Sequence, residues 1–493
     1  MNYSNYLKFL IFLSLVISFF FSCQKDSFIT DTDAKLSFSM DTVLFDTVFT
    51  TIGSTTQQLR VLNKHNKTIQ ISEIYLAGGD ISNFRLNING VQTIETENIE
   101  IAANDSMYIF IEVTVDPNDQ NSPLIITDSI IFSTNGNIQD INLVAWGQDA
   151  FFHSANTYMQ FISGVDTFHF PYHTIHENPV WTNEKPHVVY GYVGIDANDI
   201  FTIEAGTQIH FHYNSGIIVW PGGSLKVNGE LGNEVVFQGD RLEEFYDELP
   251  GQWDRIWLYG GSINNEINYA IIKNAIIGLH VDTVFNSNPT LKISNTKIEN
   301  MNAIGIFAQG AVIEADNCVI ANCGQHSVAL SIGGKYRFNH CTIANYWTHS
   351  SRASQAALLL NNYYKDVYGN FQIRDLEEAY FGNCLIYGSI EDEIGFDYFP
   401  NEGIFNYKFD HCLMKMYEPG VDTTDTETFI NIKYNLEPNF ISTISPFDYQ
   451  LDTLSAAKDQ ANINISLMFP IDLNGNKRLE NSTSDIGAFE RVE

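Results

Sequence analysis

The dipeptide His-Cys occurs twice in the sequence, as His340-Cys341 in "NHCTIAN" and as His411-Cys412 in "FDHCLMK". Histidine and cysteine are common ligands of zinc and other soft metals. A cysteine thiolate beside an imidazole base is also the arrangement that activates a nucleophile. The repeated pair is therefore a candidate for a metal centre or a catalytic dyad. The elements that carry it decide whether its two side chains can meet.

Both pairs belong to an internal repeat. The repeat appears when six segments are aligned: 267–275, 293–301, 315–323, 338–346, 381–389 and 409–417. One column of the alignment then reads Ala270, Thr296, Cys318, Cys341, Cys384 and Cys412, and the column two residues later reads Ile272, Ile298, Ile320, Ile343, Ile386 and Met414. Most steps are roughly 22 to 28 residues, with one longer step from Cys341 to Cys384, and this period is typical of a solenoid.

The repeat predicts where each member of the pair points. Strand positions two apart share a face, so the cysteine and isoleucine columns face inward together and their neighbouring column faces outward. That outward column reads Tyr269, Asn295, Asn317, His340, Asn383 and His411. His340 and Cys341 therefore face opposite sides and cannot act on one atom. We interpret the cysteines as a core ladder, with a disulfide or a metal site as the alternatives.

A further column predicts a ladder at a turn. It contains Asn274, Asn300, Asn322 and Asn345, and Gly388 takes the same position in the next repeat. Asparagine tolerates left-handed backbone and can hydrogen-bond the asparagine of the next coil.

Residues 150–430 carry the sequence texture of short strands separated by glycine and polar turns. The stretch "IFTIEAGTQIHFHYNSGIIVWPGGSLKVNGELG" and the later "GQWDRIWLYG" resemble the opening rungs of right-handed parallel β-helix, pectin-lyase-like proteins. The resemblance implies an all-β chain in which each coil of this region contributes its strands to parallel sheets.

Residues 36–149 alternate apolar and polar positions over short segments divided by turns. In "MYIFIEVTV" the residues Met107, Ile109, Ile111, Val113 and Val115 share one face. Such strands predict an antiparallel β-sandwich. The region resembles an immunoglobulin-like module of surface proteins, which implies a role in spacing or adhesion.

Residues 431–493 depart from the repeat. Asp472, Gly475, Arg478 and "DIGAFE" (485–490) resemble the signature of a C-terminal segment found on bacterial β-helix surface proteins. Because a solenoid must protect its last coil from edge-to-edge pairing, we expect this segment to be a cap over that coil.

The N-terminus predicts export and anchoring. Lys8 precedes an apolar run at 9–21, which has the length of a signal-peptide core and is shorter than the roughly 20 residues that span a bilayer. Cys23 after Ser22 resembles a bacterial lipoprotein site, which implies a signal peptide at 1–22, a lipid on Cys23 and a tether at 23–35. "CQKD" resembles the signal that sends Bacteroidota lipoproteins to the outer face of the outer membrane. A plain secretory signal is the alternative.

The charge and the motifs limit the function classes. A net charge of −33 argues against nucleic acid as a partner, because phosphate binding needs clustered cations. The catalytic motifs of β-helix polygalacturonases, such as "NTD" and "GHG", do not occur. We predict no cofactor, and Ca²⁺ enters only if the protein is an enzyme that acts on polysaccharides. His169, His173, His176 and His187 have metal-like spacing without a periodic element that would converge them, so we predict no metal site.

Two insertions interrupt the short-strand pattern and carry aromatic residues. The first, 240–257, offers Tyr246, Trp253 and Trp257, and the second, 347–370, offers Trp347, His349, Arg352, Tyr363 and Tyr364. Aromatic rings beside hydrogen-bonding groups suit sugar rings, and loops on a rigid scaffold commonly carry function. The alternative is that these rings only pack the insertions onto the solenoid.

These observations favour a membrane-anchored cell-surface protein with a non-catalytic role in glycan binding or adhesion. We expect its partner to be a glycan or a host-cell surface. Two alternatives stay open: a polysaccharide lyase or glycoside hydrolase that acts on an extracellular polysaccharide, and a structural envelope protein.

Overall fold

The structure is a computed structural model. It describes residues 28–492 apart from 51–52, 116–123, 164–165, 284–288, 353–354, 419 and 481. The chain divides into two compact units, residues 1–149 and 150–493. The predicted signal peptide and Cys23 lie outside the described residues.

The first unit is a β-sandwich of two five-stranded sheets. One sheet has the order β1 (Ser37–Phe38), β3 (Gln57–Leu62), β8 (Ser106–Val113), β5 (Phe84–Ile88) and β6 (Val91–Gln92), and the other has the order β2 (Thr42–Phe49), β10 (Asn137–Gln148), β9 (Leu124–Thr134), β4 (Ile69–Leu76) and β7 (Glu95–Ile101). All pairs are antiparallel except β2 with β10. The predicted apolar face of β8 and of Val115, which follows the strand, is buried in the core.

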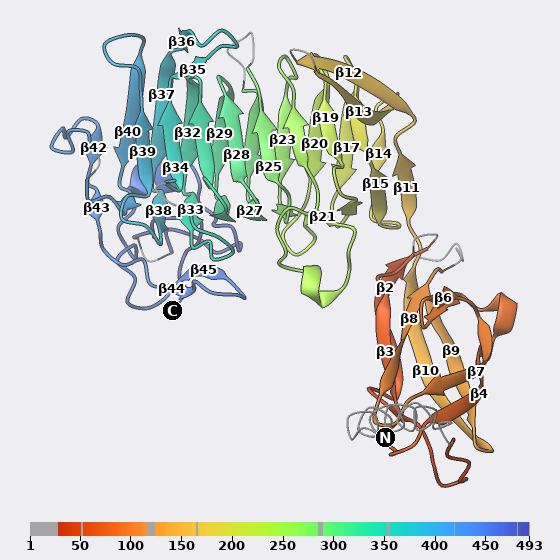
Figure 1. The fold of residues 1–493 in the computed structure, drawn as a ribbon. Coiled ribbons are helices and arrows are strands. Elements are labelled where there is room, and N and C mark those ends of the chain that lie inside the picture. Colours follow the sequence, from red (N-terminus) through yellow and green to blue (C-terminus); the bar gives the residue numbers. More distant parts are fainter. Residues whose placement is uncertain are drawn as a thin grey trace, which may run out of the picture. The chain divides into compact units, whose positions relative to one another are not determined.

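The second unit is a right-handed parallel β-helix, which we call the solenoid, built from three long sheets (Figure 1). Sheet 1 contains β11 (Phe151–Ser154), β15 (His187–Tyr190), β18 (Gln208–Phe211), β21 (Val235–Gly239), β24 (Ala270–Lys273), β27 (Lys297–Met301), β30 (Val319–Cys323), β33 (Thr342–Asn345), β38 (Leu385–Gly388), β41 (Leu413–Met414) and β43 (Lys433–Tyr434). Sheet 2 contains β12 (Thr157–Ser163), β13 (Asp166–Ile175), β16 (Tyr192–Ile195), β19 (Gly216–Val219), β22 (Arg255–Leu258), β25 (Ile277–Val281), β28 (Ile304–Gln309), β31 (Val328–Ser331), β34 (Leu358–Asn361) and β39 (Ile394–Asp397). Sheet 3 contains β14 (Val180–Trp181), β17 (Ile200–Glu204), β20 (Ser224–Asn228), β23 (Asn265–Asn268), β26 (Leu291–Ser294), β29 (Val312–Asp316), β32 (Gly334–Asn339), β37 (Leu376–Gly382), β40 (Phe405–Asp410) and β42 (Phe429–Ile430).

The predicted fold class is thus confirmed, and the inward columns form the core of the solenoid. Successive coils add strands to the three sheets, and all neighbours in these sheets are parallel except β12 with β13. Cys318, Cys341, Cys384 and Cys412 are fully buried and free, like the isoleucine column beside them. A free cysteine in such a core packs as a small hydrophobe.

The neighbouring column explains why histidine precedes cysteine twice. All six of its residues have positive φ angles between 46° and 52°, so the chain turns there in the left-handed conformation: Tyr269, Asn295, Asn317, His340, Asn383 and His411. Asparagine and histidine are enriched in this region of backbone space. Their side chains hydrogen-bond along the stack, for example Asn317 Nδ2 to Asn295 Oδ1 at 3.2 Å.

The predicted turn ladder of asparagines is present in its first part. Asn300 Nδ2 donates to Asn274 Oδ1 at 2.6 Å, and both residues are left-handed. Further along the column the partners differ, because Asn322 Oδ1 accepts the hydroxyl of Tyr449 and Asn345 Nδ2 donates to the carbonyl of Cys323.

The remaining elements lie outside the three sheets. They are the hairpin of β35 (Tyr363–Lys365) and β36 (Phe371–Ile373), the pair of β44 (Phe440–Ser442) and β45 (Asp448–Leu451), the short helix α2 (Ile463–Ser466) and the 3-10 turns η1 (Gly79–Ile81) and η2 (Glu244–Tyr246).

The C-terminal segment covers the side of the solenoid, which corrects the expectation that it caps the last coil. Figure 1 shows β44 and β45 beside β33 and β38, away from the end formed by β42 and β43. Apolar residues of the tail pack on the outer face of sheet 1, where they bury Val319, Ala321, Ala344, Leu385 and Leu413. The outer face of that sheet is apolar in these coils, so it needs such a cover.

The signature residues of the tail hold it on the left-handed column. Arg478 is fully buried, and its Nη2 donates to Asn317 Oδ1 at 2.8 Å and to the carbonyl oxygens of Gly487 and Ala488. Asn383 exchanges two hydrogen bonds with the backbone of Asn462.

His340 also binds the tail, which corrects its expected exposure. Its side chain points away from the core, opposite to Cys341, but the tail buries it completely. Nε2 lies 3.0 Å from Ser466 Oγ, and Nδ1 lies 3.3 Å from the carbonyl oxygen of Gly487. Burial lowers the pKa of His340 well below its usual value, so the ring is neutral and positions the tail.

We predict that Arg478→Ala loosens the tail and lowers the free energy of unfolding by about 3 kcal/mol, because it removes the donor of a buried charged network. Denaturant unfolding followed by tryptophan fluorescence measures the change, and limited proteolysis tests whether cleavage starts in 435–492. Lys477→Ala is the matched control, because Lys477 is the exposed neighbour. Equal unfolding midpoints for the two variants would contradict this role.

Candidate functional site

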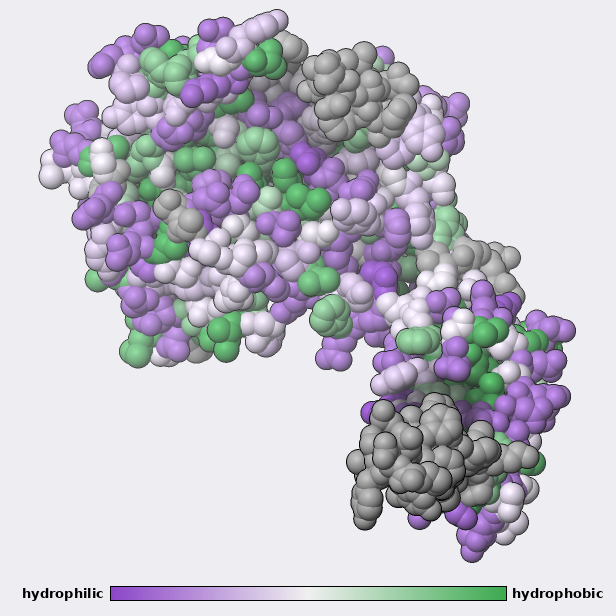
Figure 2. Space-filling view, in the orientation of Figure 1, coloured by the Kyte–Doolittle hydropathy of each residue, from purple (hydrophilic) through white to green (hydrophobic). Residues whose placement is uncertain are grey.

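The outer face of sheet 2 carries an aromatic column. Parallel register aligns Trp257 on β22, His280 on β25 and Phe307 on β28. The ring centroids of Trp257 and His280 are 5.0 Å apart with planes 4° from parallel, and those of His280 and Phe307 are 4.9 Å apart. Within a mostly hydrophilic surface, Figure 2 shows hydrophobic residues gathered near β25 and β28.

A hydrogen-bond network fixes this column. Trp257 Nε1 donates to Asp282 Oδ2 at 2.9 Å, while His280 Nε2 lies 3.1 Å from Asp282 Oδ1 and 2.9 Å from Gln309 Oε1. Arg255 Nη1 lies 3.1 Å from His280 Nδ1, and a guanidinium can only donate. Nδ1 of His280 is therefore the acceptor, so Nε2 carries the hydrogen that Asp282 and Gln309 share.

The network continues into the preceding coils. Arg255 Nε donates to Asp254 Oδ1 at 3.0 Å, and the hydroxyl of Tyr192 donates to Asp254 Oδ2. Burial first, and then the nearby Asp254 carboxylate, raise the pKa of Tyr192 well above its usual value. The phenol consequently keeps its proton, and both Asp254 oxygens accept hydrogen bonds.

Beside the column lies a groove with a volume of about 540 Å³, which we call the Trp257 groove. It is lined by Trp257, Tyr259, Gly260, Asp282, Thr283, Gln309, Ile332, Tyr364 and Arg374. Sheet 2 and its turns supply most of this lining, and the β35–β36 hairpin with the residue that follows it supplies Tyr364 and Arg374. The Arg374 guanidinium lies over the Tyr364 ring, 5.8 Å from its centroid.

The groove unites one residue from each predicted insertion, Trp257 and Tyr364. Tyr363, next in the hairpin, donates its hydroxyl to Asp397 Oδ1 at 2.7 Å, and its ring contacts Phe371 and Phe399. Tyr363 therefore fastens the hairpin to the last strand of sheet 2.

Three predicted ligand-binding residues are buried and hold the fold instead. Trp253 is fully buried, and its ring stacks on Phe211 with centroids 4.4 Å apart. Trp347 is 7% exposed, and its Nε1 donates to Ser350 Oγ. Arg352 forms a buried ion pair with Glu393, whose carboxylate lies 2.6 Å from Nη2.

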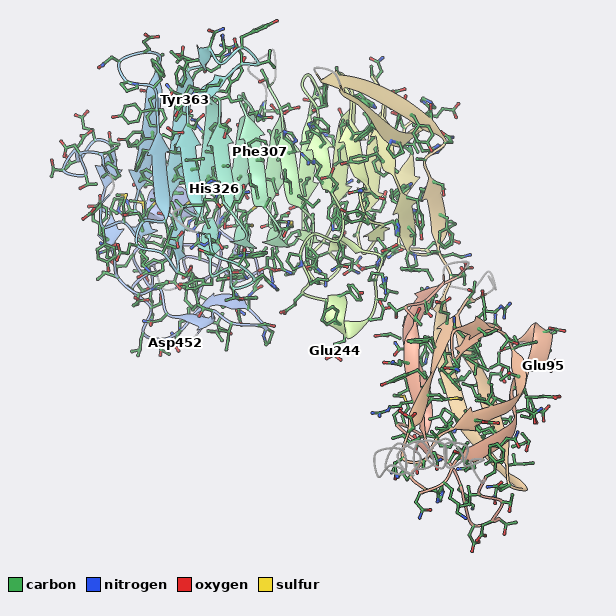
Figure 3. The ribbon with its side chains drawn as sticks, in the orientation of Figure 1. Glu95, Glu244, Phe307, His326, Tyr363 and Asp452 are labelled. Atoms are coloured by element: carbon green, nitrogen blue, oxygen red, sulfur yellow. The ribbon has the colours of Figure 1, made fainter. Side chains whose placement is uncertain are left out.

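The other two predicted residues lie at the surface, apart from the groove. His349 is exposed, beside the ring of Trp347. Tyr246 belongs to η2, and the Arg241 guanidinium lies 4.6 Å from its ring centroid. Figure 3 shows Glu244 of the same turn on a loop that projects from the opposite side of the solenoid to Tyr363, so this part of the first insertion does not reach the groove.

Sequence reasoning missed several members of the groove, namely Tyr259, Asp282, Gln309, Ile332 and Arg374. Tyr259 follows Trp257 in the quoted "WLYG", and the period that aligned the cysteines would also have aligned the outward positions of sheet 2. Arg374 had no such signal, because it follows an insertion whose direction the repeat does not encode.

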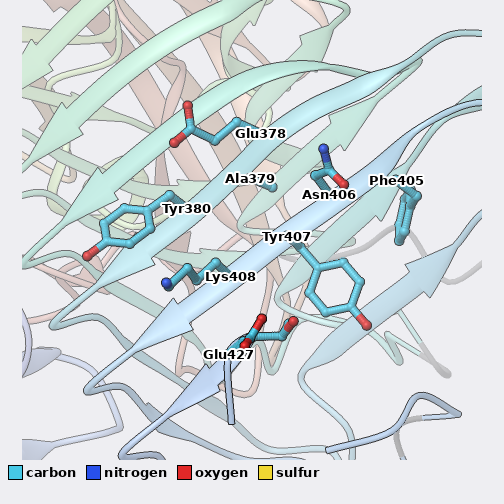
Figure 4. Close-up of a pocket in the computed structure, with 9 residues that line it drawn as sticks. Glu378, Ala379, Tyr380, Phe405, Asn406, Tyr407, Lys408 and Glu427 are labelled. Atoms are coloured by element: carbon cyan, nitrogen blue, oxygen red, sulfur yellow. The ribbon is translucent and has the colours of Figure 1, made fainter. Parts of the chain in front are cut away.

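A second hollow, of about 560 Å³, lies on sheet 3 (Figure 4). It is lined by Glu378, Ala379, Tyr380, Phe405, Asn406, Tyr407, Lys408, Glu427 and Thr428. Glu378 is neutralised, because it forms ion pairs with Arg337 and Lys335.

Neither hollow contains an evident metal centre. In the part of the chain that the structure describes, no three histidine, cysteine, aspartate or glutamate side chains are grouped to hold a metal ion. Over the same residues, no helix is long and apolar enough to cross a membrane.

The two central tryptophans give a direct test of these assignments. We predict that Trp253→Ala lowers the free energy of unfolding by about 3–5 kcal/mol, because it leaves a cavity in the core. Trp257→Ala should cost clearly less, because its ring lies at the surface of sheet 2. Denaturant unfolding of both variants checks the order, and a larger loss for Trp257→Ala would contradict it.

Comparison with known proteins places the repeat region in a broad class. Residues 277–436 match a family model described as a right handed beta helix region. No curated protein matches the chain.

The following solved structures are only weakly similar to the chain. The catalytic unit of a GH87 α-1,3-glucanase from Streptomyces thermodiastaticus aligns over 72% of this chain and 73% of that one, at 8% identity and a TM-score of 0.25. A PapD-like domain of human CEP192 aligns over 26% and 92%, at 10% identity and a TM-score of 0.17. A family 123 glycoside hydrolase from Clostridium perfringens aligns over 23% of this chain and 26% of the hydrolase, at 12% identity and a TM-score of 0.17. The match therefore spans about a quarter of that hydrolase.

Proposed function

We propose that this β-helix protein is a cell-surface lipoprotein that binds neutral glycans in the Trp257 groove without cleaving them. The observation that carries the proposal is the convergence of Trp257 and Tyr259, from the solenoid, with Tyr364 and Arg374, from the insertion, on one groove. Aromatic side chains beside a few fixed polar groups are the usual lining of a site for small polar ligands such as sugars.

The polar groups of the groove suit recognition. Trp257 and His280 donate to the two oxygens of Asp282, which fixes the carboxylate in place. Gln309 is held in the same way by His280. Such preorganised acceptors can receive sugar hydroxyls without a further loss of side-chain freedom. The net charge of −33 favours a neutral glycan over a polyanionic one.

Binding is favoured over catalysis by the state of the nearby carboxylates. General acid–base catalysis needs a carboxyl group that can exchange a proton with the substrate. Both oxygens of Asp254 and both oxygens of Asp282 already accept hydrogen bonds from other side chains. These bonds fix the direction of each carboxylate and tie it to the side chains of the network.

A second candidate function is a polysaccharide lyase or hydrolase. The observation in its favour is that Asp254, Arg255, His280 and Asp282 form one continuous polar chain along sheet 2. A guanidinium or imidazole at the edge of a sugar-binding groove could take part in proton transfer if substrate displaced one of its partners.

The binding proposal predicts loss of affinity at defined positions. In a screen of immobilised neutral oligosaccharides, the mature protein should bind a subset. Trp257→Ala and Tyr364→Ala should each weaken that binding at least about tenfold, because each removes a ring that contacts the sugar. Trp257→Ala also removes the indole donor that positions Asp282. Tyr246→Ala and Tyr368→Ala are matched controls from the same two insertions. If the controls weakened binding as much as the groove variants, the site would be elsewhere.

The same oligosaccharides separate the two candidate functions. Incubation with the protein, with and without Ca²⁺, followed by measurement of reducing ends and of unsaturated products, should show no turnover. New reducing ends or unsaturated products that the His280→Ala variant fails to generate would favour the enzymatic function. If the protein showed neither binding nor turnover, the structural envelope role would be the remaining candidate.

The anchor proposal has its own prediction. Cys23→Ala should release the protein from washed outer membranes into the soluble fraction, because acyl chains at this residue are its proposed attachment. Fractionation and immunoblotting of cells expressing each form make the comparison, with Ser22→Ala as the control. Unchanged membrane retention of Cys23→Ala would contradict lipid anchoring.

A further inference from the structure

Sheet 3 is incomplete at the last coil. Strand β40 spans Phe405–Asp410 and pairs along its length with β37. On its other side β42 pairs with only Phe409 and Asp410. The following coil therefore leaves one strand position beside Phe405–Lys408 empty among the described residues.

The hydrogen bonds of β40 show which backbone groups face the empty position. Phe409 N donates to Thr428 O at 2.8 Å, and His411 N donates to Ile430 O at 2.8 Å. Alternate residues of a strand direct their N–H and C=O to the same neighbour. Phe405 and Tyr407 therefore direct theirs to the empty position, where no described backbone group pairs with them.

The hollow on sheet 3 occupies this place. Phe405, Asn406, Tyr407 and Lys408 line it along one strand, and Glu427 lies beyond the strand edge (Figure 4). Its volume is about 560 Å³. The hollow is thus a slot that extends from Glu378–Tyr380 of β37 over β40 to the chain at 427–428, and it includes the unpaired edge of β40.

We propose that this slot, which we call the β40 slot, binds an extended peptide strand of a partner protein. An extended backbone presents N–H and C=O groups at the spacing that Phe405 and Tyr407 require, and it can form four hydrogen bonds with them. Exposed strand edges are templates for such pairing. This binding is independent of the glycan proposal, because the Trp257 groove lies on another sheet.

The side chains of the slot indicate the partner's sequence. Phe405 and Tyr407 pack against the core of the solenoid, so the inward positions of an added strand must be apolar. Lys408 forms no ion pair with a described residue, whereas Glu378 is already paired with Arg337. An acidic residue at an outward position of the strand would complement Lys408. We therefore expect alternating apolar and acidic residues.

Two capped hexapeptides test the proposal, one of alternating valine and glutamate and one of alternating valine and lysine. With the mature protein, fluorescence anisotropy should show at least about tenfold tighter binding of the glutamate peptide. N-methylation of every residue of the glutamate peptide removes its backbone donors and should abolish binding. In hydrogen exchange, the peptide should slow the amides of Phe405 and Tyr407.

Variants locate the binding. Tyr407→Pro removes one edge N–H that β37 does not use, and edge positions tolerate proline, so it should abolish peptide binding without loss of fold. Tyr407→Val keeps the donor and should retain binding, and Lys408→Glu should weaken it. Equal binding of the N-methylated peptide, or no protection of the two amides by either peptide, would overturn the proposal. Self-association that Tyr407→Pro abolishes would overturn it too, in favour of a second copy.

Discussion

The parallel pairing between successive coils is the constraint on which the rest of the solenoid depends. Because each coil repeats the register of the one before, side chains of the same position stack in columns. The rings of Phe338, Phe381, Phe409 and Phe429 form one such column, with successive centroids 5.3, 5.0 and 5.6 Å apart. The buried cysteines form a second column, and the left-handed asparagines and histidines form a third.

This register gives the two members of the His-Cys pair separate tasks. Cys341 fills a step of the core, whereas His340 adopts the left-handed turn and then binds the C-terminal tail. The recurrence of the pair reflects the period of the solenoid. The same principle produces the polar column of sheet 2, where stacking brings Trp257 beside His280 and sets Asp282 within reach of both.

The two proposed recognition sites lie where the regular stacking is interrupted. The Trp257 groove exists because the β35–β36 hairpin leaves the coil array and returns Tyr364 and Arg374 toward sheet 2. The β40 slot exists because the last coil omits most of one strand. A continuous solenoid surface offers flat columns, whereas an insertion or an omission creates a concave place with groups from distant segments.

The periodic features were predictable from the sequence, since they depend on local alternation repeated many times. The inward direction of Cys318 and the opposite directions of His340 and Cys341 followed from spacing alone. Whether a single residue of an insertion is buried or exposed could not be predicted from this spacing. Trp253 and Trp257 are four residues apart in one insertion, yet Trp253 enters the core because the chain rejoins the coil there.

Long-range partners were equally hidden from the sequence. Arg352 looked like a ligand-binding cation, but Glu393, on a later coil, neutralises it inside the protein. The tail carried a recognisable signature without any indication of which surface it covers. Asn317 and Asn383 bind the tail, because the left-handed column presents their side-chain amides on the side of the solenoid. Only the folded coils define that position.

The most direct measurement of the central claim is a crystal structure of the mature protein with an oligosaccharide selected for binding. We expect an intact glycan in the Trp257 groove, in contact with Tyr259 and Tyr364 and with hydroxyls near Asp282 and Gln309. A glycan bound elsewhere on the chain, or cleaved in the groove, would contradict the account.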